Sequence, residues 1–371
     1  PEAGARHPLV WRRILRTEVE VFDDSGELAR IVAGATMDDR YVYLPVHPLE
    51  LSRWPDEELI SSGFIAISAS YRTVFFEPEP GGLLADCSLD NQTLMIKLHL
   101  EAPLPGIAGD RRLDRERVEK CVTLSQALRE AVGEDPLADR LVVVPEFLGY
   151  ASSGHGVLFR TVPETGAIPL FSLTSTDPET GTSPLVAWLR GRYGDDGMSI
   201  ATELGEQLAL PLIRSLCAGF RAGFSLEMHA QNTLIAPGDD QLIDAVYFRD
   251  LEGVVFSNSY RVARGLDPLF ADLDNGELKN ECRPMALWFN RNLDHDLGRV
   301  FSAALADLER NGLFGRAERR AAVRSIKKAA RRTIAEARLE DLAGSGRWLP
   351  ISRSPYGNGL GKGDYYRTRF R

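Results

Sequence analysis

Strand-like and helix-like segments are segregated along this chain of 371 residues. Before about residue 162, apolar residues occur mainly in short runs with β-branched and aromatic side chains, a pattern typical of strands. From residue 201 onward, spacings such as Leu204, Leu208, Leu212 and Leu216 predict helices. Strands followed by helices, without regular alternation, favour an α+β fold over a doubly wound parallel sheet.

The expected elements have approximate residue ranges. We expect strands at 40–46, 66–76, 93–100, 141–147 and 156–162, and helices at 114–132 and 201–223. Pro211 is expected to kink the second helix. A hairpin is expected over 232–250, turning at 238–240, followed by mostly helical chain from 262 to 343. The stretch 163–184, rich in Pro, Thr, Ser and Gly, predicts a long loop.

The chain length predicts two parts, at about 150 residues per domain. We expect a β-rich part at 1–150 and a part at 151–371 that contains the hairpin and the helical C-terminal region. The net charge of -9 argues against a broad nucleic-acid surface. The sequence has no run of about 18 apolar residues and no signal peptide at its start, so we expect a cytoplasmic protein without a membrane span.

The four cysteines, Cys87, Cys121, Cys217 and Cys282, are widely spaced and form no C-x-x-C pair. This spacing argues against a disulfide framework and against a structural zinc site. We therefore expect reduced and mostly buried thiols.

A polar run interrupts an apolar region between the second helix and the hairpin. It reads Glu227-Met228-His229-Ala230-Gln231-Asn232. Oxygens of Glu227 and Asn232 suit magnesium, and His229 and Gln231 can donate hydrogen bonds to phosphate or ribose. The alternative interpretation is a polar helix-to-strand loop that satisfies its own hydrogen bonds.

Two carboxylates, Asp250 and Glu252, follow the expected hairpin. They lie two residues apart in a segment that we expect to be extended, so both should point to the same side. Such a pair suits a magnesium-nucleotide site. The alternative interpretation is a surface cluster of salt bridges.

Hydroxyl and cationic side chains occur together on the early strands. Ser70, Arg72 and Thr73, with Lys97 on a later strand, are the residue types of a polyphosphate site. The glycine-rich P-loop pattern is absent, which excludes a Walker-type site. The alternative interpretation is an ordinary edge strand.

Three further features have both a purely structural and a functional interpretation. The neighbouring Arg111 and Arg112 suit capture of a substrate with several carboxylates, or are a solvated pair before a helix. We expect His155 to be a loop histidine. The basic run 316–338 is expected to be a packed helix with a solvated outer face.

Taken together and in this order, the motifs resemble the IucA/IucC-type siderophore synthetases, which work without a non-ribosomal peptide synthetase. The resemblance covers about residues 40–300, and its most specific part is Glu-x-His-x-Gln-Asn followed about twenty residues later by Arg-Asp. The matching segments are Leu44–Pro48, Ser70–Thr73, Lys97–Leu100, Glu227–Asn232 and Arg249–Gly253. The resemblance implies a palm, fingers and thumb architecture, with the ATP site on an antiparallel sheet.

The resemblance also implies an activity. A carboxylate of a citrate-like acid would be activated with ATP and Mg²⁺ as an acyl adenylate and joined to an amine or hydroxylamine. The residues implied as catalytic are Arg72, Lys97 and His229. Those implied for ATP are Ser70, Arg72, Thr73, Lys97, His229, Gln231, Asn232 and Asp250. Those implied for the substrate carboxylate are Arg111, Arg112, Arg160 and His47, and those for magnesium are Glu227, Asn232, Asp250 and Glu252.

The sequence departs from the family in three respects. Leu49 and Glu50 follow His47-Pro48, where the family usually has Trp-Gln. The spacing from Arg72 to Lys97 is longer than usual, and family members are much longer. Besides its acid and amine substrates, the expected partners are a second copy of the chain, because dimers would fit the family, or a separate N-terminal chain, with neither nucleic acid nor membrane. Two alternative functions stay open: a phosphotransferase, which would release ADP, and a partner-dependent module without catalysis of its own.

Overall fold

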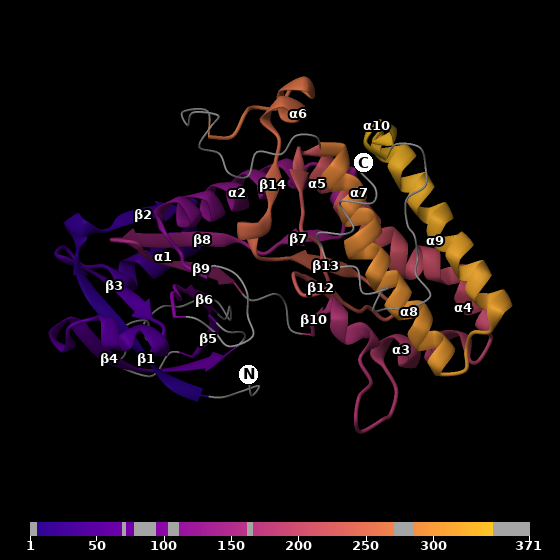
Figure 1. Cartoon of the computed structure of the whole chain (residues 1–371), viewed down its shortest axis with the longest axis horizontal. Helices are drawn as coiled ribbons and strands as arrows, with labels where there is room; N and C mark the ends of the chain where they lie inside the picture. The colour runs from indigo at the N-terminus through magenta and orange to yellow at the C-terminus, as the bar shows by residue number, and fades with distance from the viewer. Residues whose placement is uncertain are drawn as a thin grey trace. The chain divides into compact units, whose positions relative to one another are not determined.

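The computed structural model describes residues 6–68, 72–77, 94–102, 111–161, 166–270 and 285–343. The chain divides into two compact units (Figure 1). Unit 1 comprises Pro1–Arg129, Val144–Pro163 and Asp250–Glu252, and unit 2 comprises Glu130–Val143, Glu164–Arg249 and Gly253–Arg371. This division differs from the single boundary expected near residue 150, because the chain passes between the units several times.

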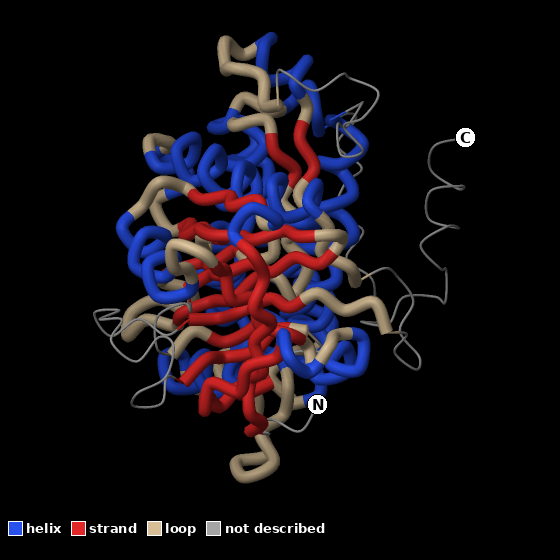
Figure 2. The backbone as a smooth tube through the Cα atoms, turned by 90° about the vertical axis from the view of Figure 1, so that its left-hand side faces the viewer, coloured by secondary structure: helices blue, strands red, loops and turns tan. Residues whose placement is uncertain are grey.

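Unit 1 is built on an eight-stranded sheet within its described residues, in the order β2-β8-β9-β6-β5-β4-β1-β3. All neighbouring strands are antiparallel, and Figure 2 shows strands in red running side by side. The strands are β1 (Arg6–Leu15), β2 (Glu20–Asp23), β3 (Tyr41–Val46), β4 (Leu59–Ser68), β5 (Thr73–Glu77), β6 (Leu94–Leu98), β8 (Glu146–Ser152) and β9 (His155–Thr161).

Helices cover both faces of this sheet. Residues of α1 (Glu27–Thr36) share one core with Val157 and Phe159 of β9. Val118 of α2 (Arg115–Gly133) belongs to a second core with Leu158. Because successive side chains on a strand point to opposite faces, the two helices lie on opposite sides of the sheet. The central strands are therefore buried on both faces, and all five side chains of β6 are buried.

Unit 2 combines two small sheets with helices. The larger sheet has the strand order β10-β12-β13-β7, and β13 and β7 pair in parallel, which departs from the purely antiparallel sheet expected. Its strands are β10 (Ile168–Pro169), β12 (Thr233–Ala236), β13 (Ala245–Phe248) and β7 (Leu141–Val143), and the smaller sheet consists of β11 (Phe224–Ser225) and β14 (Val255–Phe256). The helices are α3 (Pro184–Tyr193), α4 (Gly197–Leu204), α5 (Leu210–Arg221), α6 (Asn258–Ala263), α7 (Met285–Arg291), α8 (Gly298–Arg310), α9 (Arg316–Ala337) and α10 (Glu340–Ala343).

The α+β class is confirmed as a mixed fold with antiparallel sheets and C-terminal helices. The expected hairpin is β12–β13, in which Thr233 pairs with Phe248 and Ala236 with Ala245. The basic run forms α9, and the expected strand at 141–147 is divided between β7 and β8. The expected loop at 163–184 contains β10 and a 3₁₀ turn at Leu170–Thr174.

The structure corrects the helix expected at 201–223. A π-helical turn at Gly205–Ala209 separates α4 from α5, so the chain does more than kink at Pro211. Pro211 lies in the first turn of α5, where a helix does not require the missing N–H. His155 is also placed differently from the expected loop: it begins β9 and is 2% exposed.

Two expectations concern bulk properties. Of the helices in the described part of the chain, none has both the length and the apolar character to cross a bilayer. Cys121 and Cys217 are free and buried, whereas Cys87 and Cys282 lie outside the described residues.

Candidate functional site

Adjacent strands of unit 1 bring together the cationic residues expected from the sequence. Lys97 on β6 lies opposite Thr73 on β5 and Leu158 on β9. Arg72 immediately precedes β5, and its carbonyl accepts a hydrogen bond from the backbone N–H of Leu98 at 2.7 Å. The long sequence separation between Arg72 and Lys97 is therefore bridged by strand pairing.

Lys97 is the centre of a buried ion-pair cluster. Its Nζ lies 2.6 Å from Oδ1 of Asp250 and 2.9 Å from Oε2 of Glu252, and its side chain is 1% exposed. Nη2 of Arg72 donates to the same Glu252 oxygen at 2.5 Å. Burial on its own would lower the pKa of Lys97, but the two carboxylates outweigh burial and raise that pKa above its usual value. Lys97 therefore keeps its charge.

The two carboxylates reach Lys97 from a tight turn. The expectation of an extended segment is wrong, because Asp250 has a φ of 73° and Leu251–Gly253 form a 3₁₀ turn. A positive φ is uncommon for residues other than glycine, and aspartate tolerates it better than most. Burial would raise the pKa of both carboxyl groups, but Lys97 and Arg72 hold the pKa values of Asp250 and Glu252 below their usual range.

Two residues that the sequence analysis missed hold this turn. Oε2 of the fully buried Glu146 accepts the backbone N–H of Leu251 at 3.3 Å, and Nζ of Lys120 on α2 donates to the carbonyl of Glu252 at 2.7 Å. Burial lowers the pKa of Lys120. Neither residue belongs to a polar motif. The available signal was the charge of Glu146 within an apolar strand pattern.

Arg160 completes the cluster in unit 1. Its Nη2 donates to Oγ1 of Thr73 at 3.0 Å, and its Nη1 lies 3.5 Å from Oε1 of Glu146. Its buried Nε has no hydrogen-bond partner within the described part of the chain. A buried guanidinium N–H without an acceptor fits an anion supplied by a ligand.

The two neighbouring arginines meet the cluster through their backbone. The carbonyl of Arg111 accepts a hydrogen bond from Nη1 of Arg72 at 2.5 Å, and the carbonyl of Arg112 accepts one from Nη1 of Arg117 at 2.6 Å. Both Arg111 and Arg112 are exposed. Ser70, expected beside Arg72, lies outside the described residues.

Glu50 lies in a short 3₁₀ helix at Pro48–Arg53, and His47 immediately precedes this helix. Nδ1 of His47 accepts the backbone N–H of Leu49 at 3.1 Å, which caps this helix. Glu50, at the position where the family usually has Gln, is 1% exposed and accepts the backbone N–H of Ala102 at 2.7 Å. In this chain Glu50 therefore ties two backbone segments of unit 1 together.

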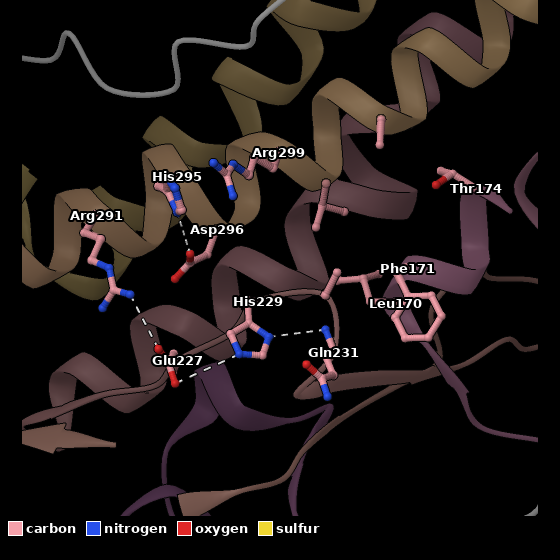
Figure 3. A pocket seen from close by; sticks show the side chains of 13 residues that line it. Leu170, Phe171, Thr174, Glu227, His229, Gln231, Arg291, His295, Asp296 and Arg299 are labelled. Atoms are coloured by element: carbon pink, nitrogen blue, oxygen red, sulfur yellow. Dashed lines mark hydrogen bonds and ion pairs between the residues drawn. The ribbon is translucent and has the colours of Figure 1, made fainter. Parts of the chain in front are cut away.

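In unit 2, the expected polar loop borders a pocket of about 460 Å³. Nδ1 of His229 accepts the backbone N–H groups of Gln231 and Asn232, both at 3.3 Å, and its Nε2 lies 4.0 Å from Oε2 of Glu227 (Figure 3). Oε1 of Glu227 is 3.4 Å from Nη2 of Arg291. Glu227, His229 and Gln231 line the pocket, whereas the buried Asn232 is not among its lining residues.

None of the sequence motifs indicated the residues on the helical side of this pocket. This side is formed by Arg291, His295, Asp296 and Arg299, on and beside the π-helical turn Asn292–Leu297 that joins α7 to α8. Nδ1 of His295 lies 2.9 Å from Oδ1 of Asp296. The four-residue spacing of Arg291, His295 and Arg299 places basic side chains on one helix face, and this was the available sequence signal.

The unit 1 cluster has the donor types that a magnesium-nucleotide would require. Arg72, Lys97 and Arg160 are buried cations suited to phosphate or carboxylate oxygens. Across the described ranges, no group of three or more His, Cys, Asp or Glu side chains is arranged to hold a metal ion. Asp250 and Glu252 nevertheless fit magnesium, because Mg²⁺ is commonly held by one or two carboxylates together with phosphate oxygens and water.

Comparisons with known proteins gave matches by structure alone. No protein-family model matched the chain, and no characterised protein matched its sequence. ATP-bound aerobactin synthetase IucA from a hypervirulent pathotype of Klebsiella pneumoniae matches with a TM-score of 0.61 and 18% identity, covering 90% of this chain and 62% of that one.

Two further solved structures are similar. Aerobactin synthetase IucC from the same pathotype gives a TM-score of 0.62 at 17% identity, over 90% of this chain and 63% of that one. Petrobactin biosynthesis protein AsbB from Bacillus anthracis str. Sterne gives 0.65 at 16% identity, over 94% of this chain and 67% of that one. The chain thus spans only 62–63% of the length of the two aerobactin synthetases. It has the fold of these siderophore-biosynthesis proteins, as its motifs predicted.

Proposed function

We propose that this chain is an ATP-dependent carboxylate–amine ligase of siderophore biosynthesis. It activates a carboxylate of a citrate-like acid as an acyl adenylate, releases pyrophosphate, and condenses the acyl group with an amine or hydroxylamine. The observation that carries the proposal is the buried cluster in which Lys97 pairs with Asp250 and Glu252, and Arg72 pairs with Glu252, in a fold that matches ATP-bound IucA. We also propose a palm, fingers and thumb architecture with the β12–β13 hairpin in the palm.

In this proposal the cluster exchanges its partners when ATP binds. The phosphates take the place of Asp250 and Glu252 beside Lys97 and Arg72, with Ser70 and Thr73 as further phosphate ligands. The carboxylates of Asp250 and Glu252 would then hold Mg²⁺, which would supply positive charge to neutralise the phosphate oxygens. Lys97 and Arg72 stabilise the charge that develops when the substrate carboxylate attacks the α-phosphorus.

The polar loop of unit 2 has a part in the same proposal. His229, Gln231 and Asn232 would bind the nucleotide, and Glu227 and Asn232 would be further oxygen ligands for magnesium. Arg160, with its unpartnered Nε, and the exposed Arg111 and Arg112 bind the carboxylates of the acid. His47 is a further residue for the acid, because Nδ1 accepts the backbone N–H of Leu49 and the ring proton is therefore on Nε2 as a donor.

Single substitutions test the assignment. Carboxylate-dependent pyrophosphate release, screened over a panel of polycarboxylates, should fall about 100-fold or more in Arg72→Ala, His229→Ala and Asp250→Ala, because each removes charge stabilisation or nucleotide binding. Arg320→Ala, on the exposed side of α9, is the matched control and should keep wild-type activity. Full activity in all three variants would refute the proposal.

The products distinguish two rival functions. A phosphotransferase acting at the same site would form ADP, whereas the ligase forms AMP and pyrophosphate. Leu49 and Glu50, which follow His47-Pro48 in place of the family's Trp-Gln, motivate a second rival, a module that requires a partner. Such a module would bind ATP but turn it over only after a second polypeptide is added.

A further inference from the structure

A buried carboxylate oxygen without a partner lines the unit 2 pocket. Asp296 lies in the π-helical turn, and its side chain is 4% exposed. Oδ1 is 2.9 Å from Nδ1 of His295, but the buried Oδ2 accepts no hydrogen bond from any described residue. Buried carboxylate oxygens normally have a donor, so this oxygen is suited to a donor that arrives with a ligand.

The π-helical turn explains how His295 and Asp296 meet. Side chains one residue apart on a regular α-helix point about 100° apart and do not face each other. A π-helical turn changes this phase locally, and such turns are frequent at functional sites. Figure 3 shows both side chains on the pocket side of their helix, above Glu227 and His229. The turn therefore places a carboxylate where a regular helix would direct it elsewhere.

Arg299 also lines the pocket but donates no hydrogen bond to Oδ2 of Asp296, so the local chemistry at Oδ2 favours a cationic ligand. An ionised carboxylate only accepts hydrogen bonds, so it requires N–H or O–H groups. The second acid of the pocket, Glu227, already has Arg291 at 3.4 Å. A substrate carboxylate placed at Oδ2 would be repelled by like charge, whereas an ammonium group would be attracted.

The rest of the lining suits an alkyl chain. Leu170, Phe171, Val300 and Ala303 supply apolar surface next to the polar groups. A pocket of about 460 Å³ has the size of small-molecule sites, which are mostly apolar with a few polar anchors. We propose that the helical side of this pocket binds the amine substrate, next to the nucleotide-binding His229 and Gln231, with Asp296 accepting hydrogen bonds from the primary ammonium group of an alkylamine. As a claim about the amine of the ligase reaction, this inference rests on the proposed function.

Direct binding tests the pocket without relying on catalysis. Titration calorimetry of the full chain with 1,5-diaminopentane should show binding to the wild type and at least 10-fold weaker binding to Asp296→Asn. Asp240→Asn, which removes an exposed carboxylate that pairs with Arg192, is the control and should bind like the wild type. Absence of binding to the wild type, or equal affinity of wild type and Asp296→Asn, would overturn the inference. So would tighter citrate binding by Asp296→Asn with diamine affinity unchanged.

A second variant keeps the test decisive if Asp296→Asn does not fold. Phe171 lines the pocket and is 51% exposed, so its truncation should not disturb the core. Phe171→Ala should weaken the binding of 1,5-diaminopentane more than that of 1,3-diaminopropane, because the longer chain contacts more of the apolar wall. Equal affinities of Phe171→Ala and the wild type for both diamines would overturn the alkyl part of the inference.

Product ratios separate this inference from the proposed function. Hydroxylamine is small and uncharged at neutral pH, so its capture of an activated acid reports activation without the ammonium contact. The ratio of diamine product to hydroxamate should fall at least 10-fold in Asp296→Asn. If the wild type forms no hydroxamate with any acid, the proposed ligase function is refuted. Calorimetry would still show whether the pocket binds an amine. An unchanged ratio would show that Asp296 does not select the amine.

Discussion

Lys97 shows how a single residue can require partners from a distant part of the chain. A charge buried to 1% exposure is unfavourable unless it is paired, and its carboxylate partners lie more than 150 residues further along the sequence. Removing one member of a buried pair is more destabilising than the pair itself is stabilising, since the remaining charge stays buried. Lys97, Asp250 and Glu252 therefore form one structural unit as well as a candidate site.

Replacing Lys97 should destabilise the fold. Lys97→Met should lower the free energy of unfolding by about 3–5 kcal/mol, because Asp250 loses its closest cation and Glu252 loses one of its cationic partners. Urea denaturation at pH 7 measures the change. Lys328→Met, on the exposed side of α9, is the matched control and should stay within about 0.5 kcal/mol of wild type. Equal stability of Lys97→Met and the wild type would contradict the description of the cluster.

The buried His155 makes stability depend on pH. Its ring stacks on that of His99 with centroids 4.9 Å apart, and burial lowers the pKa of His155 from 6.5 to about 3. The unfolded chain binds a proton below pH 6.5 whereas the folded chain does not, so the stabilisation is complete above pH 6.5 and declines as the pH falls toward 3. His155→Phe keeps the stacked ring but removes the titration.

We therefore expect a difference in acid sensitivity. Between pH 6.5 and pH 5 the wild type should lose about 2 kcal/mol more than His155→Phe, given about 1.4 kcal/mol per pH unit for one proton. Urea denaturation series at several pH values would check this difference. Parallel stability curves for the two proteins would show that His155 is not buried in its neutral form.

At the residue scale, the sequence predicted those site residues that belong to dense polar motifs. Arg72, Lys97, Asp250 and Glu252 do meet, but through strand pairing and a left-handed turn, neither of which a local pattern predicts. Glu146, Lys120 and Asp296 were missed. Each lies alone in an apolar strand or helix pattern, and only tertiary packing shows what it faces.

At the scale of elements, the apolar periodicity predicted helices but not their π-helical turns. Gly205–Ala209 and Asn292–Leu297 each lie within a continuous helical pattern. A π-helical turn adds one residue without breaking the run of apolar side chains, so the spacing signal hardly changes. The first turn contains Gly205, whose backbone approaches Ser325 of α9 and whose N–H donates a hydrogen bond to Ser325 Oγ.

A side chain at Gly205 should separate these helices. A Cβ atom at this position would lie 2.6 Å from the carbonyl oxygen of Ser325, which is backbone and cannot rotate away. Gly205→Ala should therefore cost about 1–3 kcal/mol in the free energy of unfolding. In Gly191→Ala the new Cβ meets open space in α3, and this control should be neutral or more stable by up to about 1 kcal/mol. Thermal denaturation of both variants checks the prediction, and equal melting temperatures would contradict it.

At the scale of the whole molecule, the segregation of strands and helices was enough to predict the α+β class. It was not enough to predict which segments of the chain belong to each of the two units. Unit 1 draws three residues, Asp250–Glu252, from the middle of the sequence of unit 2. The inclusion of Asp250–Glu252 in unit 1 depends on contacts such as the hydrogen bond from Lys120 to the carbonyl of Glu252. No change in amino-acid composition along the sequence indicates such a contact.

The discontinuity of unit 1 predicts the behaviour of a fragment. A polypeptide of residues 1–163 would keep Arg72, Lys97 and Arg160 but lack Asp250 and Glu252. Its buried cations would then have Glu146 as the remaining carboxylate of the cluster, which is unfavourable. We therefore expect Lys97→Met to stabilise the fragment, whereas it destabilises the full chain. Urea denaturation of the fragment and of the full chain measures the sign of the stability change caused by Lys97→Met. Destabilisation of the fragment by this substitution would contradict this account.

The threading of Asp250–Glu252 into unit 1 also limits how such proteins can be recombined. A chimaera joined anywhere between residues 98 and 249 would inherit Lys97 from one parent and its two acidic partners from the other. Only parents with matching charges on both sides of the junction would yield a folded hybrid. Diversity in a lineage with this architecture should therefore arise through point substitutions around the pockets more readily than through exchange of whole gene segments.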